Sequence, residues 1–92
     1  MDYQYVKWIH DSADYPVHLY SEIDQNRMET RSIEIWGNGT VGWADSESSI
    51  NGTILALEPL PPLDIINQDD EFDGRPISKD DFEKQWDSIK TK

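Results

Sequence analysis

The first half of the chain alternates between apolar and polar residues, a pattern that is typical of β-strands with one buried face. The alternation runs through residues 3–10, 17–23 and 28–36, and each run ends at a polar turn. The segment 37–39, with the sequence Gly-Asn-Gly, supplies residues that tolerate positive φ, and the strand pattern resumes at 41–44. The last two runs therefore predict a β-hairpin, the strongest such signal in the sequence.

The alternation also predicts which side chains share a face of the sheet. Within residues 28–36 it places Glu29 and Arg31 on the same face. Residues 45–52 have the composition of an exposed loop, and residues 53–57 can form a short fifth strand.

Two helices are expected in the second half of the chain. Proline suits the first turn of a helix, so residues 62–67 predict a short one. A longer helix begins after Ser78, because Ser78 is a capping residue and Asp81 completes a variant of the capping box. The apolar stripe of this helix consists of Phe82, Trp86 and Ile89. The pattern predicts an α+β fold in a single domain, residues 1–92: an antiparallel sheet of four to five strands, with the short and C-terminal helices packed on one face.

The charge of the chain limits its partners. Nineteen acidic and eight basic residues give a formal net charge of −11, and the excess is spread along the sequence. Such a surface repels phosphate backbones and anionic lipids, so we expect no nucleic acid and no membrane partner. A basic protein or a cation would be attracted.

Several chemical classes are excluded or disfavoured by composition. The chain has no cysteine, which rules out disulfides, thiolate zinc sites and cysteine nucleophiles. Its N-terminal residues lack the basic start and apolar run of a signal peptide, and no stretch approaches the roughly 20 apolar residues of a membrane span. We therefore expect a cytoplasmic protein.

Residues 69–80 come close to the spacing of a twelve-residue calcium loop. The matching positions are Asp69, Glu71, Asp73, Gly74 and Asp80. The eighth position is Pro76, which has no N–H to donate, and the twelfth is an Asp where a bidentate Glu is usual. Short patterns of this kind often match by accident. We predict no dedicated metal site here, only weak and salt-sensitive calcium binding.

His10, Asp11 and Asp14, with His18 nearby, are the other candidates for chemistry, as a metal or acid–base cluster. His10 ends a strand and Asp11 begins a turn, so both have structural roles. Two histidines without a paired nucleophile or a phosphate-binding loop give little basis for catalysis. We expect no enzyme activity, no catalytic residue and no cofactor.

Trp36 and Trp43 flank the predicted hairpin turn. They can stabilise the sheet as a cross-strand pair. They can also form an exposed contact patch, because aromatic side chains ringed by charge resemble interface hot spots.

Seven segments spread over nearly the whole chain form a recognisable series. They are WIHD (8–11), LYSEID (19–24), ETRSIEIW (29–36), PPLDIIN (61–67), EF (71–72), IS (77–78) and DFEKQW (81–86). The series resembles a family of small bacterial proteins catalogued as a domain of unknown function. The resemblance implies a domain of this length and a bacterial or phage origin, and it carries no activity.

The functional hypothesis is a non-enzymatic, acidic protein-binding domain, most plausibly an immunity or inhibitor protein that neutralises a basic bacterial toxin. The expected contact residues are Asp11, Asp14, Trp36, Trp43, Asp69, Asp70, Glu71 and Asp73. Two alternatives stay open: a general interaction or regulatory module whose charge serves solubility, and a nucleic-acid mimic. The oligomeric state is open as well.

Overall fold

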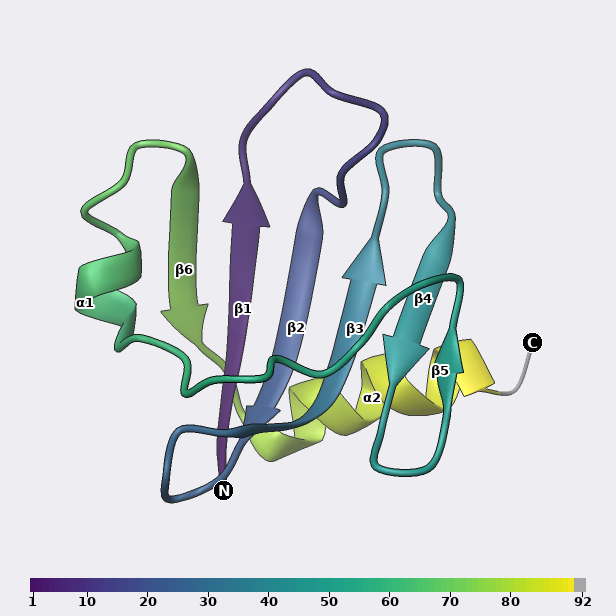
Figure 1. Cartoon of the computed structure of the whole chain (residues 1–92), viewed down its shortest axis with the longest axis vertical. Coiled ribbons are helices and arrows are strands. Elements are labelled where there is room, and N and C mark those ends of the chain that lie inside the picture. Colours follow the sequence, from purple (N-terminus) through teal and green to yellow (C-terminus); the bar gives the residue numbers. More distant parts are fainter. Residues whose placement is uncertain (91–92) are drawn as a thin grey trace.

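The computed structural model describes residues 1–90 and contains a six-stranded, fully antiparallel sheet and two helices within them (Figure 1). The elements are β1 (Asp2–Trp8), β2 (His18–Ile23), β3 (Glu29–Ile35), β4 (Val41–Ala44), β5 (Ser49–Ile50), α1 (Leu63–Ile66), β6 (Phe72–Pro76) and α2 (Lys79–Lys90). The strand order across the sheet is β5-β4-β3-β2-β1-β6. The predicted α+β class is thus confirmed, with more strands than the four to five expected.

The turns follow from side chains that bind their own backbone. In the β2–β3 turn the Asp24 carboxylate accepts hydrogen bonds from the N–H groups of Asn26 (2.8 Å) and Met28 (3.0 Å). In the β3–β4 turn the Asn38 side chain accepts from the N–H of Thr40 (3.0 Å), and Gly39 takes a φ of 89°. The predicted hairpin is present.

A β-bulge on β3 changes which residues share a face. Glu22 pairs with Arg31, but Ile23 pairs with Glu29, so that Thr30 is an extra residue in the ladder. The extra residue rotates Glu29 to the opposite face from Arg31. The expectation that Glu29 and Arg31 lie on one face was therefore wrong, because simple alternation does not detect a bulge.

Two strands lie where the sequence pattern did not place them. Residues 53–57 form no strand; the fifth strand is β5, and the chain then crosses the sheet as an irregular segment. We call residues 53–62 the strap. β6 lies in what was expected to be a connection between two helices, and it pairs with the edge of β1. It was missed because it is short, contains Gly74 and ends at Pro76, both unfavourable for strands except at an edge.

The two helices do not pack on one face, which corrects the sequence prediction. α2 covers one side of the sheet, whereas α1 and the strap lie on the other side (Figure 1). Leu63 of α1 lies over Gly74, on the side of the sheet that Val6 occupies. Among residues 1–90, no helix has the length and apolar content needed to cross a bilayer.

The core lies between α2 and the sheet. Its buried members are Ile33, Phe82 and Trp86. Trp86 meets Trp43 edge-on with ring centroids 5.3 Å apart, and Phe82 lies 5.4 Å from the ring of Tyr3. The predicted helix start is confirmed as well, since the Ser78 hydroxyl accepts from the N–H of Asp81 at 3.0 Å.

Arg31 connects this core to the sheet through charge. Its guanidinium pairs with Glu22 on β2 and with Glu83 on α2, at 2.5 Å in both cases. It also lies 4.8 Å from the ring centre of Phe82 and 5.0 Å from that of Trp86. The hydrogen bond from Arg31 lowers the pKa of Glu22 to about 2, and the same contact raises the pKa of Arg31 above its usual value.

Truncating Trp86 tests whether α2 closes the core. The Trp86→Ala variant should lose about 3–5 kcal/mol of unfolding free energy, because the ring is only 8% exposed and packs on two other aromatic rings. Urea denaturation followed by circular dichroism measures the loss. Trp36→Ala, at a half-buried turn position, is the matched control and should cost about 1 kcal/mol. Equal stabilities of the two variants would contradict the packing described.

The Glu22–Arg31 pair predicts an acid-sensitive contribution to stability. The folded-state pKa of Glu22, about 2, lies below its ordinary value of 4.5. The ionised carboxylate therefore stabilises the fold above pH 4.5, and this contribution is lost as the pH falls toward 2. Glu22→Gln should lose roughly 3 kcal/mol at neutral pH, at about 1.4 kcal/mol per pKa unit. Urea denaturation at several pH values should show the gap to wild type closing in acid, and a constant gap would contradict the linkage.

Candidate functional site

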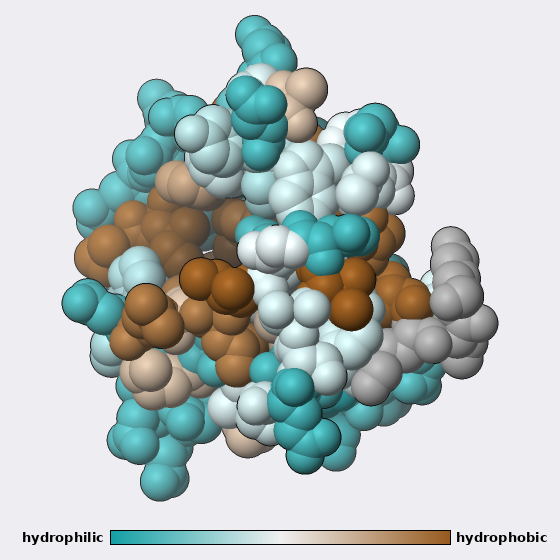
Figure 2. Space-filling view, turned by 45° about the vertical axis from the view of Figure 1, so that its right-hand side comes forward, coloured by the Kyte–Doolittle hydropathy of each residue, from teal (hydrophilic) through white to brown (hydrophobic). Residues whose placement is uncertain are grey.

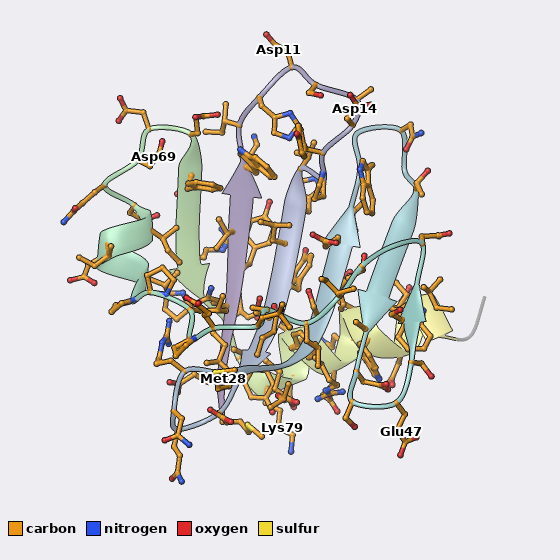
Figure 3. The ribbon with its side chains drawn as sticks, in the orientation of Figure 1. Asp11, Asp14, Met28, Glu47, Asp69 and Lys79 are labelled. Atoms are coloured by element: carbon orange, nitrogen blue, oxygen red, sulfur yellow. The ribbon has the colours of Figure 1, made fainter. Side chains whose placement is uncertain are left out.

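The structure brings two acidic loops together at one end of the sheet. The loop after β1 and the loop before β6 are adjacent because Trp8 pairs with Phe72, and the Ile9 N–H donates to the Glu71 carbonyl at 2.7 Å. Figure 3 shows Asp11, Asp14 and Asp69 at this end. We call the group the acidic end: Asp11, Asp14, Asp69, Asp70, Glu71 and Asp73, all of them exposed.

The loop before β6 is ordered by its own polar groups. The Asp69 carboxylate accepts from the N–H of Glu71 (2.9 Å), which tightens the turn. The side-chain amide of Asn67 binds both backbone groups of Gly74, accepting at 2.6 Å and donating at 2.9 Å. Asn67 thus occupies the outer edge of β6 at this position, where another strand would otherwise pair. Because Asn67 occupies the backbone groups of Gly74, a partner would contact this loop through its side chains.

The loop after β1 is braced by His10. Its Nε2 donates to the Pro16 carbonyl (2.8 Å), and its Nδ1 accepts from the N–H of Ser12 (3.1 Å). Ser12 in turn accepts from the N–H of Asp14 at 3.1 Å. These partners assign the Nε2–H tautomer and occupy both ring nitrogens. His10 therefore holds the loop that carries Asp11 and Asp14.

His18 is not part of this group, although the sequence places it nearby. Its Nδ1 is 2.6 Å from the hydroxyl of Tyr5, and the two rings stack with centroids 5.8 Å apart. Both side chains lie on the α2 side of the sheet. The suspected cluster of both histidines with Asp11 and Asp14 is thus divided between separate sites.

Aromatic rings lie directly beneath the acidic end. Trp8 is within 4.8 Å of His10, 5.2 Å of Tyr15 and 5.6 Å of Phe72, measured between ring centroids. Tyr15 is 54% exposed, so this cluster reaches the surface between Asp14 and Pro16. Sequence reasoning missed Tyr15; the available signal was an aromatic residue within a polar, proline-closed turn.

The two tryptophans of the predicted contact patch are separated. Trp36 lies beside the acidic end, since its Nε1 donates to the Asp14 carbonyl at 3.4 Å. Trp43 instead packs on Trp86 beneath α2. They form no cross-strand pair, because Trp43 is opposite Ile33 in the ladder.

Residues 69–80 do not wrap around a common centre. They pass from a turn into the extended strand β6 and then into the first turn of α2. Figure 3 shows Asp69 and Lys79, the neighbour of Asp80, at opposite ends of the molecule. Within residues 1–90, no three His, Asp or Glu side chains are grouped so that they could hold a metal ion.

Comparison with known proteins identifies a family without an assigned role. A family model described as "Domain of unknown function (DUF6881)" matches residues 2–91, which confirms the resemblance seen in the sequence. No curated protein matches the chain, and no solved structure does.

The brace formed by His10 predicts local order in the acidic loop. In His10→Ala, the amides of Ser12 and Asp14 should exchange with deuterium several-fold faster, because their hydrogen bonds depend directly or indirectly on the ring. Amide exchange measured by NMR tests this. The N–H of Thr40, held by Asn38 in another turn, is the internal control and should not change. Unaltered exchange at Ser12 would contradict the role of His10.

Proposed function

We propose that this chain, which belongs to the DUF6881 family, is a non-enzymatic protein-binding domain. Its role would be that of a bacterial, cytoplasmic immunity or inhibitor protein that neutralises a basic toxin. The observation that carries the proposal is the convergence of two acidic loops, far apart in the sequence, at one end of the sheet. The acidic end supplies the charge, and Tyr15 and Trp36 beside it supply the aromatic groups that such a contact needs.

The two segments that carry the acidic end hold charge of a single sign. Residues 9–17 and 66–74 together hold all six acids of the acidic end and contain no lysine or arginine. Lys7 is the nearest basic residue in the ladder, opposite Asp73. A surface of one sign attracts a basic partner over distances up to the screening length, roughly 8 Å at physiological salt. Association would therefore be fast and salt-dependent.

Two aromatic side chains at the acidic end favour a lasting contact. Tyr15 is more than half exposed, and Trp36 is half-buried beside Asp14. Each ring combines a large apolar surface with a polar group, which is the composition of interface hot spots. Burial of these rings would slow dissociation, while the surrounding carboxylates would guide approach. The proposed contact does not include Trp43, because this side chain packs on Trp86.

The surface is also ordered before any partner arrives. His10 holds one loop through both ring nitrogens, and Asn67 holds the other through Gly74. Loops that are already fixed lose less conformational entropy on binding. This favours recognition by a rigid acidic patch over coupled folding of a flexible segment.

Charge removal at the acidic end should slow association with the natural partner. The partner is first captured from a lysate of the source cells, identified by mass spectrometry and purified. Stopped-flow mixing at low and high salt then compares wild type with an Asp11→Asn, Asp70→Asn, Asp73→Asn variant. We expect association about tenfold slower at low salt, with dissociation changed much less. Co-expression should also restore growth of cells that the partner alone arrests.

The control variant carries the same change in net charge elsewhere. It is Asp2→Asn, Glu47→Gln, Glu58→Gln, three exposed acids outside the acidic end; Glu47 lies at the opposite end of the sheet (Figure 3). Its association rate should fall by less than about threefold. Equal effects of the two triple variants, or a partner that is not basic, would overturn the proposed site.

A further inference from the structure

The face of the sheet opposite α2 contains a cavity of about 590 Å³ beneath the strap. Figure 2 shows a hollow on this side, with hydrophobic residues gathered around it. A volume of this size is typical of pockets for small organic molecules, which span roughly 300–1,000 Å³.

The strap that forms one wall is fixed to the sheet at three points. Thr53 is fully buried against Gly42, where a Cβ would overlap the Thr53 side chain. The N–H of Ala56 donates to the Glu29 carboxylate at 3.0 Å. The N–H of Leu60 donates to the Arg27 carbonyl at 2.8 Å, and the Arg27 guanidinium binds the Leu60 and Pro61 carbonyls in return. The cavity is therefore preformed.

The floor of the cavity consists of two rows of side chains that cross β1, β2 and β3. One row is polar: Gln4 pairs with Ser21, and Ser21 pairs with Ser32. The next row is Val6, Leu19 and Glu34, paired in the same way. Most other walls are apolar, from the strap, α1 and Phe72. Polar groups are thus a minority of the lining.

One of these polar groups lacks a partner. Gln4 is only 4% exposed, and its Oε1 accepts no hydrogen bond from the residues that the structure describes. A buried carbonyl oxygen that accepts no hydrogen bond destabilises the fold. By contrast Glu29, also in the cavity wall, already accepts from Ser21 at 2.6 Å and from Ala56. The Gln4 oxygen has almost no accessible surface and Glu29 is already bonded, so neither offers an open contact to a ligand.

The ionisable groups of the cavity have one sign. Glu29, Glu34 and Asp69 line it, and its lining contains no lysine, arginine or histidine within residues 1–90. Glu34 is half-buried, and its carboxylate is not needed to hold the strap. An anion would meet only repulsion here, whereas a cation attached to an apolar body would satisfy both the walls and the charge.

We propose that this cavity binds a small arylalkylamine, an apolar body that carries a cation. The ring lies against Val6, Leu19 and the strap, and the ammonium lies beside Glu34. This site does not depend on the proposed inhibitor function; the two share only Asp69, at the rim.

Tryptamine is the probe, and NMR titration of the labelled protein is the measurement. Saturable shifts should appear at the amides of Ser21 and Ala56, which border this cavity. Gln4 also borders a second hollow, of about 580 Å³, together with Ile77 and Lys79. Shifts centred on Ile77 and Lys79, or no saturable shifts at all, would overturn the proposal.

Matched ligands and variants test the contact between the ammonium and Glu34. Glu34→Gln should weaken tryptamine about three- to tenfold and leave the neutral analogue 3-ethylindole unaffected. Glu47→Gln, the same change outside the cavity, should alter the affinity for neither tryptamine nor 3-ethylindole. Equal binding of tryptamine and indole-3-propionate, an anion, would contradict the assigned charge preference.

Discussion

The ion pairs and ring contacts of Arg31 hold the two layers of this protein together. The side chain leaves β3, pairs with Glu22 on β2 and with Glu83 on α2, and lies over two rings of the core. A guanidinium suits this position because it combines planar hydrogen bonding with stacking on aromatic faces, which a lysine cannot reproduce. With α2 held in this way, the remaining core of Ile33, Phe82 and Trp86 can exclude water.

The opposite face of the sheet is covered by an irregular segment held by hydrogen bonds. No long helix covers it among the described residues; the strap does so, held by hydrogen bonds to Glu29 and Arg27. Glu29 is available for this because the bulge at Thr30 turns it away from the α2 side. Burial raises the pKa of its carboxyl, while bonds from Ser21 and Ala56 oppose that effect. The face under α2 is thus closely packed, and the face under the strap contains a cavity.

Charge is used differently in the core and on the surface. Glu22 and Arg31 are mostly buried and stabilise the fold through each other. The carboxylates of the acidic end are exposed, where single charges contribute little to stability. Most of them are therefore free to serve recognition, since the loops that carry them are held mainly by hydrogen bonds of His10 and Asn67. A partner at this end would not need to disturb the layer around Arg31.

The sequence by itself determined the local elements and the class of the fold. The alternation of the first strands, the hairpin at Asn38 and Gly39 and the cap at Ser78 all depend on neighbours within a few residues. Tertiary structure alone decided the rest, because each remaining feature joins distant segments. β6 exists as a strand through its pairing with β1, the same pairing assembles the acidic end, and Gln4 lines a cavity only because the strap returns across it. Local periodicity cannot predict such contacts, because they stabilise a segment only after the distant segments have come together.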